Sequence, residues 1–241
     1  MKNKVFFILI VLICSCSKKY DFSEIDGLIK EQKYRQASEI LSTIETESLI
    51  DSTDIKKYNH RLLLAKKGLM FQYFDSILAV GDSEKINQAL VQIKQKISTI
   101  DSGKARWYWF DFYTRRAGLY FNNSQRREWQ ISAEKAVNFP TEQDSIKRKL
   151  LFDLAFYFAV DGKFVNAREW LDKAIRGLDA QAERSFLNDA YILYMNGDYK
   201  QANLILSSNS EKIIDKDWKR FSGFLSLYAD SLTMENRFRL W

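Results

Sequence analysis

The chain carries one pattern twice, first as LAFYFAVDGKFVNAREWL at residues 154–171 and again as DAYILYMNGDYKQANLIL at residues 189–206. The copies are 35 residues apart, and each has a glycine between two apolar stretches. Within each stretch, apolar residues recur at intervals of three and four, which is the spacing of one helix face. A repeat of this length that holds two helices predicts helix pairs stacked on one another.

Three positions of the pattern resemble the tetratricopeptide repeat. In that family a small residue on the first helix lets the second helix approach, an aromatic residue opens the second helix, and an alanine packs between the two. The matching residues are Ala155 and Ala190, then Phe164 and Tyr199, then Ala167 and Ala202. Lys33-Tyr34-Arg35-Gln36-Ala37, followed by Leu41, is a third copy of the second-helix part.

Two weaker copies lie between, anchored at Ile86-Asn87-Gln88-Ala89 and at Trp129-Gln130-Ile131-Ser132. With them, the second helices follow one another at intervals of 52, 43, 35 and 35 residues. The segment from about 211 to 236 predicts a capping helix, which open solenoids need at their ends. The resemblance therefore implies an all-α fold over residues 21–241, a tetratricopeptide-like α-solenoid of about five helix pairs plus a C-terminal capping helix.

Helix boundaries are predicted by residues that cap helices or accept a positive φ. Such breaks occur at Gly27, Gly81-Asp82, Asp101-Ser102-Gly103, Asn122-Asn123-Ser124, Asp161-Gly162 and Asn196-Gly197-Asp198. They divide the chain into about eleven helices, and no stretch predicts a strand.

The N-terminus resembles a bacterial lipoprotein signal. Lys2 and Lys4 precede an apolar run at 5–13, and Ile13-Cys14-Ser15-Cys16-Ser17 is similar to a lipobox. A run of this length suits a signal-peptide core and is too short to span a bilayer, which needs about 20 residues.

The cleavage site follows from the residue before each cysteine, because signal peptidases need a small side chain there. Ser15 favours cleavage before Cys16 over cleavage before Cys14. We expect residues 1–15 to be removed, Cys16 to carry the acyl chains of the lipoprotein family, such as palmitate, and residues 16–20 to form a tether. Without an aspartate after Cys16, the resemblance implies the outer membrane of the bacterial cell envelope. The alternative is an ordinary cleaved signal in a secreted protein.

The sequence lacks the combinations of residues that form the usual catalytic sites. His60 is the single histidine, and Cys14 and Cys16 are the two cysteines. One histidine cannot form the usual metal sites, and neither a nucleophile elbow nor a phosphate-binding loop is present. We therefore expect a protein that is not an enzyme and has no cofactor or metal site.

Positive charge is concentrated between residues 104 and 127, where six cations stand against Asp111 alone, among many aromatic residues. Arginine binds carboxylates bidentately, and aromatic rings anchor interfaces or stack on sugars. As a contact surface, this segment would bind a partner through Arg106, Trp107, Trp109, Arg115, Arg116, Arg126 and Arg127. The alternative is that the aromatic residues of helix 104–121 are core and the arginines a solvated face.

Two functions compete. The leading hypothesis is a lipid-anchored scaffold that binds another envelope protein or peptide and is held on the membrane by its acyl chains. The second is a glycan, peptide or small-molecule binding or sensory module of the envelope. Export excludes nucleic acid as the partner. The long first helices and the residue usage also resemble lipoproteins of the Bacteroidota.

Overall fold

A computed structural model describes residues 20–45, 49, 52–100, 105–176, 178 and 185–238 of the chain. Within these residues the fold is all-α, with twelve α-helices, a short 3-10 helix at Ser210–Lys212 and no strand. The helices are α1 (Ser23–Lys30), α2 (Tyr34–Thr43), α3 (Ser52–Leu78), α4 (Ser83–Gln88), α5 (Leu90–Ile100), α6 (Ala105–Asn122), α7 (Arg126–Val137), α8 (Asp144–Val160), α9 (Phe164–Ile175), α10 (Ser185–Met195), α11 (Tyr199–Ser208) and α12 (Lys216–Phe238).

The chain divides into two compact units, and the boundary between Tyr73 and Phe74 falls within α3. In the first unit α1, α2 and the first part of α3 share one apolar cluster, which includes Phe22, Ile25, Ala37, Leu41, Ile44, Leu49, Tyr58 and Ala65. Arg61 on α3 donates hydrogen bonds of 2.8 and 2.6 Å to the Asp26 carboxylate and lies over the Phe22 ring.

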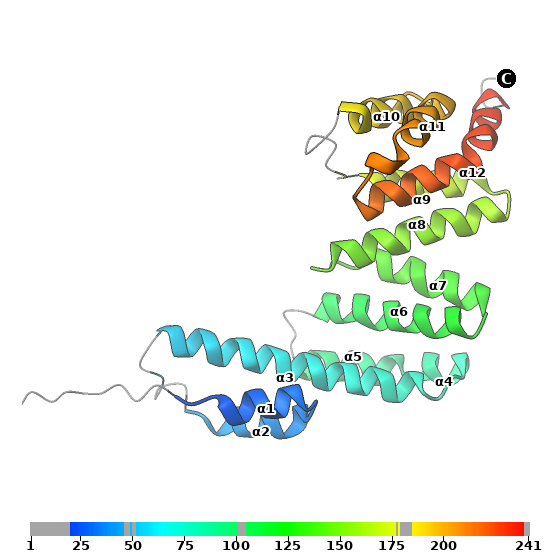
Figure 1. Ribbon diagram of the computed structural model, residues 1–241. Helices are drawn as coiled ribbons and strands as arrows, with labels where there is room; N and C mark the ends of the chain where they lie inside the picture. The colour runs from blue at the N-terminus through cyan, green and yellow to red at the C-terminus, as the bar shows by residue number, and fades with distance from the viewer. Residues whose placement is uncertain are drawn as a thin grey trace, which may run out of the picture. The chain divides into compact units, whose positions relative to one another are not determined.

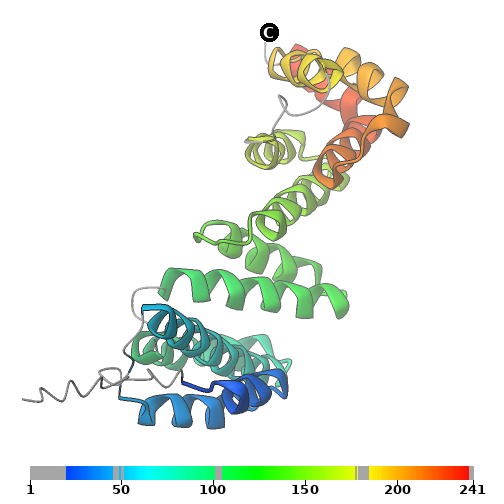
Figure 2. The same ribbon diagram turned by 60° about the vertical axis from the view of Figure 1, so that its left-hand side comes forward.

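In the second unit, helices that follow one another in sequence pack as pairs. α6 packs on α7, α8 on α9, and α10 on α11, and α7 also contacts α8. Both views of the ribbon show α6 to α9 stacked in sequence order (Figures 1 and 2). The apolar stripe that the sequence predicts on α8 is buried, and it consists of Leu151, Leu154, Ala155 and Phe158.

The turn inside each helix pair has one recurring backbone geometry. A residue with positive φ occupies it in all five turns of the described chain, and these residues are Gln32, Gly81, Ser124, Gly162 and Gly197. In every case the second helix begins two residues later. Four of the turns also have a hydrogen bond to the carbonyl five residues back, as from Lys163 N–H to Phe158 at 2.9 Å. This is the Schellman ending of a helix, which satisfies its last carbonyls and turns the chain back.

The strongest copies of the repeat are in the predicted register. α2, α9 and α11 begin at the predicted residues Tyr34, Phe164 and Tyr199. The alanines three residues later, Ala37, Ala167 and Ala202, are fully buried. An alanine there lets the two helices of a pair approach closely, because it fills little space between them.

For the two weaker copies the predicted register is wrong by one helical turn. α4 begins at Ser83 and α7 at Arg126, three residues before Ile86 and Trp129 respectively. Ile86 and Trp129 therefore take the position that alanine has elsewhere, and both are buried. The predicted break at Gly27 is also wrong, since this residue lies within α1. The predicted break at 101–103 lies outside the described residues.

A helix occupies the predicted C-terminal position. α12 packs against α8, α9 and α11, and its buried face consists of Trp218, Phe221, Phe224, Leu225, Ala229 and Leu232. At its first turn the buried Asp217 carboxylate accepts a hydrogen bond of 3.0 Å from Arg148 on α8. α12 therefore covers apolar surface at the end of the second unit.

The turn geometry predicts opposite effects for two substitutions at equivalent positions. Gly162→Ala should lower the free energy of unfolding by about 1 kcal/mol, because an L-residue is strained at its φ of 71°. Ser124→Gly should raise it by up to about 1 kcal/mol, since a glycine relieves the same strain. The added Cβ at Gly162 meets no atom within 4 Å, so packing does not contribute. Urea unfolding followed by circular dichroism measures both free energies of unfolding. If the two substitutions changed this free energy in the same direction, the turn assignment would be contradicted.

Candidate functional site

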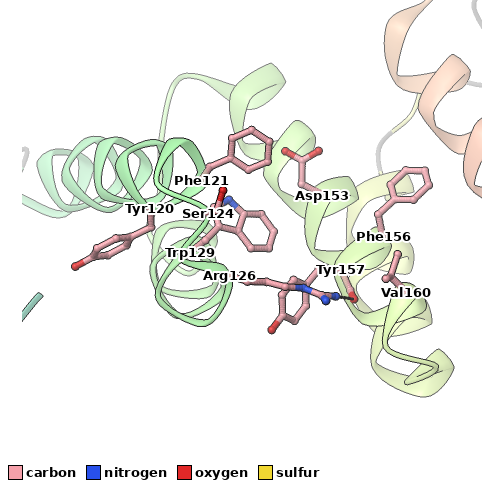
Figure 3. Close-up of a pocket in the computed structure, with 9 residues that line it drawn as sticks. All are labelled: Tyr120, Phe121, Ser124, Arg126, Trp129, Asp153, Phe156, Tyr157 and Val160. Carbon is pink, nitrogen blue, oxygen red and sulfur yellow. Dashed lines mark hydrogen bonds between the residues drawn. The ribbon is translucent and has the colours of Figure 1, made fainter. Parts of the chain in front are cut away.

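A pocket of about 730 Å³ lies in the second unit, between the α6–α7 turn and α8. We call it the α6–α8 pocket (Figure 3). Its lining residues are Tyr120 and Phe121 on α6, Ser124 in the turn, Arg126 and Trp129 on α7, and Asp153, Phe156, Tyr157 and Val160 on α8. Most of them are apolar or aromatic, which is typical of binding sites.

Two large apolar side chains at the pocket are open to solvent. Phe121 is 71% exposed and Val160 is 64% exposed. Each lies in the last turn of its helix, beside the turn that leads to the next helix. Exposed aliphatic residues are common on protein surfaces, but an exposed phenylalanine beside a concave aromatic surface is characteristic of an interaction site.

Aromatic rings form the inner wall of the pocket. Trp129 packs against Tyr157, with ring centroids 5.4 Å apart. Phe156 is supported from behind by α12, because its ring lies 5.1 Å from Phe224 and 6.2 Å from Tyr228. The wall is therefore built from α7 and α8 and is supported by α12, all within one compact unit.

Charged groups lie at the edge of the pocket and are held in place. The Arg126 guanidinium lies 4.6 Å from the centre of the Tyr157 ring and donates a hydrogen bond of 2.7 Å to Asp161. Asp153, on the opposite side in Figure 3, accepts a hydrogen bond of 2.6 Å from Lys149. A ligand in this pocket would meet apolar surface inside and charge at the rim.

The predicted contact residues do not form a single site. Arg126 lines the pocket, and Arg127 is exposed beside it on α7. Arg106 is exposed near the start of α6, outside the pocket lining. Arg115 donates a hydrogen bond of 2.6 Å to Asp75 on α3, within the second unit.

Most aromatic residues of the predicted segment are core. The buried ones are Tyr108, Phe110, Phe112, Tyr113 and Tyr120. Trp109 is half-buried and stacks on Tyr113 and Phe139, and Trp107 is also half-buried. Burial raises the pKa of Tyr113, and the nearby charge of Arg116 partly offsets that effect.

Arg116 has no place in an exposed contact surface, because only 4% of the residue is accessible. Its guanidinium donates hydrogen bonds to the Tyr120 and Ser83 hydroxyls, at 3.2 and 3.3 Å. The expectation that Arg116 contacts a partner is therefore corrected. It acts in packing between α6 and the start of α4.

Sequence reasoning missed most of the pocket. Phe121, Trp129, Phe156, Tyr157 and Val160 were absent from the predicted contact residues. The sequence of α8 did indicate part of this pocket. Phe156 and Tyr157 lie outside the buried stripe of α8, and one buried helix face does not need these additional aromatic residues.

Metal-ligating side chains do not cluster in the described part of the chain. No group of three or more histidine, aspartate or glutamate residues there could hold a metal ion. His60 is exposed on α3.

None of the helices in the described part of the chain is long and apolar enough to cross a membrane. The predicted lipidation site, Cys16, lies outside the described residues.

Comparisons with known proteins add no relative. No protein-family model, curated protein or solved structure matches this chain.

Proposed function

We propose that this protein is a lipid-anchored scaffold of the bacterial cell envelope that binds a segment of another envelope protein in the α6–α8 pocket. The observation that carries the proposal is the exposed Phe121 beside a concave wall of aromatic rings. Covering such a surface with a partner's apolar side chain removes both from water, at roughly 25 cal/mol per Å². Protein interfaces typically place aromatic residues in this way.

The architecture supports a tetratricopeptide-like solenoid. Helix pairs recur with one turn geometry, and buried alanines separate the helices in the strongest copies. Solenoids of helix pairs present extended surfaces on which successive repeats contribute to one binding site. In this protein the pocket draws its residues from two successive pairs, α6 with α7 and α8 with α9.

The second part of the proposal is the lipid anchor at Cys16. Cys16 is four residues before Tyr20, whose backbone N–H donates a hydrogen bond of 3.4 Å to Asp54 on α3. A lipidated Cys16 would therefore hold the first unit within about 14 Å of the acyl chains, since an extended chain spans at most 3.6 Å per residue. Two or more acyl chains make such attachment stable.

A second candidate function is capture of a glycan or another small ligand. Phe121 offers an exposed aromatic ring, and Arg126 and Asp153 place hydrogen-bonding groups at the edge of the same pocket. Sugar rings bind to such arrangements by stacking and by hydrogen bonds to charged side chains.

Copurification tests the scaffold. Phe121→Ser and Val160→Ser together should lower the recovery of crosslinked envelope proteins at least tenfold, because both exposed side chains border the pocket. Leu204→Ser is the matched control, since Leu204 is an exposed apolar residue on α11 outside the pocket. Unchanged protein recovery with loss of bound carbohydrate would favour the glycan function instead. Circular dichroism checks that each variant is folded.

The anchor has its own test. Cys16→Ser should abolish incorporation of labelled palmitate and release the protein from the membrane fraction. Secretion of the unaltered protein into the medium without label would support the ordinary signal peptide. This result would leave binding in the pocket untouched, so the two parts of the proposal fail independently.

A further inference from the structure

Positive charge is in excess beside the α6–α8 pocket, around Arg126, which lines the pocket, and Lys163, which lies next to Arg126 across Asp161. The Asp161 carboxylate is shared by two cations, with Arg126 at 2.7 Å and Lys163 at 3.7 Å. Both cationic side chains remain more than half exposed, at 53% and 57%. One carboxylate cannot balance both, so the cluster keeps a net positive charge that faces water.

The start of α7 adds to this charge. Arg126 and Arg127 occupy its first two positions, against Glu128 as the one acid of that turn. The positive end of a helix dipole favours acidic residues in the first turn, so two arginines there raise the local positive potential. Arg127 is exposed and makes no ion pair within the described chain. Asp153 across the pocket does not offset the excess, because Lys149 already neutralises it at 2.6 Å.

An apolar pocket and a cationic rim together specify the partner's chemistry. We propose that the segment bound here places an apolar side chain between Phe121, Phe156 and Val160, with acidic residues beside it that face Arg126, Arg127 and Lys163. The occupant is therefore an acidic, amphipathic segment of another protein. This inference rests on the proposed function, because it names the partner of the same pocket.

The interior and the rim act at different stages of binding. Burial of the apolar side chain supplies most of the affinity, since interface hot spots cluster in well-packed, desolvated pockets. The exposed cations select against basic segments and speed the encounter with acidic ones, and salt screens this effect. Binding should therefore weaken as ionic strength rises, while the apolar contact persists.

The test uses a random twelve-residue peptide display library, selected on the purified full-length protein. Enriched peptides should share an aromatic or large aliphatic residue with aspartate or glutamate within three positions of it. A synthetic peptide of that sequence, followed by fluorescence anisotropy, should bind at least tenfold more weakly to the double variant Arg127→Glu with Lys163→Glu. Arg106→Glu is the matched control, because this exposed arginine lies at the start of α6, at the opposite end of that helix from Phe121 in the pocket.

Each result decides the inference. Enrichment of neutral or basic peptides, or equal affinity for the charge-reversed variant, would overturn the acidic partner. In either of these cases, if Phe121→Ser lost binding of the enriched peptide, the pocket would still be supported as a protein-binding site. If no shared sequence is enriched, or if Phe121→Ser binds the selected peptide as the unaltered protein does, the pocket itself is rejected. Circular dichroism of each variant excludes unfolding as the cause.

Discussion

Phe224→Ala should lower the free energy of unfolding of the second unit by about 3–5 kcal/mol, the usual cost of truncating a buried phenylalanine. Phe224 is fully buried on α12 and lies against two rings, Phe156 at 5.1 Å and Tyr228 at 5.0 Å. Its loss leaves a cavity between α12 and α8 and removes two aromatic contacts. Urea unfolding followed by circular dichroism measures the change.

Leu227→Ala is the matched control for this prediction. Leu227 lies three residues further along α12, but its side chain is exposed. Its truncation should therefore change the free energy of unfolding by less than about 0.5 kcal/mol. Similar losses for the two variants would mean that α12 does not pack on α8 through the face containing Phe224. Because Phe156 lines the pocket, Phe224→Ala should also weaken partner binding in protein that is still folded.

Gly68→Ala should destabilise the first unit by about 2 kcal/mol, although glycine to alanine usually stabilises a helix interior. A Cβ at this position would clash with Cδ1 of Tyr34, which is the first residue of α2. The half-buried Tyr34 ring would have to give up its contact with α3 to make room for the added Cβ. The aromatic residue that opens α2 therefore depends on a glycine on α3.

A double-mutant cycle isolates this contact. In a Tyr34→Ala background, Gly68→Ala should become stabilising by up to about 1 kcal/mol, because the clash is gone and only helix propensity remains. Gly118→Ala on α6 is the control, since its added Cβ meets no atom within 4 Å. If Gly68→Ala is equally destabilising in both backgrounds, Tyr34 does not pack on Gly68.

The turns were predictable from the sequence because their physical cause is local. Gly162 and Gly197 accept a positive φ that other residues resist, and each is followed by an aromatic residue and an alanine at fixed spacing. The same backbone occurs at Gln32 and Ser124, where no glycine marks it. Registers were therefore predicted correctly where an alanine follows the turn at the fixed spacing, as at Ala37, and were wrong by one turn at Ile86 and Trp129, where a larger residue fills the alanine position.

The site was less predictable because exposure depends on packing between helices far apart in sequence. The segment at 104–127 left two interpretations open, a basic and aromatic surface or core aromatic residues, and α6 buries Tyr108 and Phe112 as core. Arg116 looks like a surface residue in the sequence and is buried against Ser83, 33 residues earlier. Of the predicted contact residues, Arg126 alone lines the pocket. Phe121 remains exposed because it lies where α6 ends.

The central claim is that the α6–α8 pocket binds a segment of another envelope protein. The most direct measurement is photo-crosslinking in intact cells, with benzoylphenylalanine replacing Phe121 in one strain and Leu204 in a control strain. The account predicts one defined envelope protein joined to position 121 and absent from position 204, with the crosslinked peptide containing an apolar residue beside acidic ones. Equal crosslinking at both positions, or none at 121 in folded and membrane-bound protein, would contradict it.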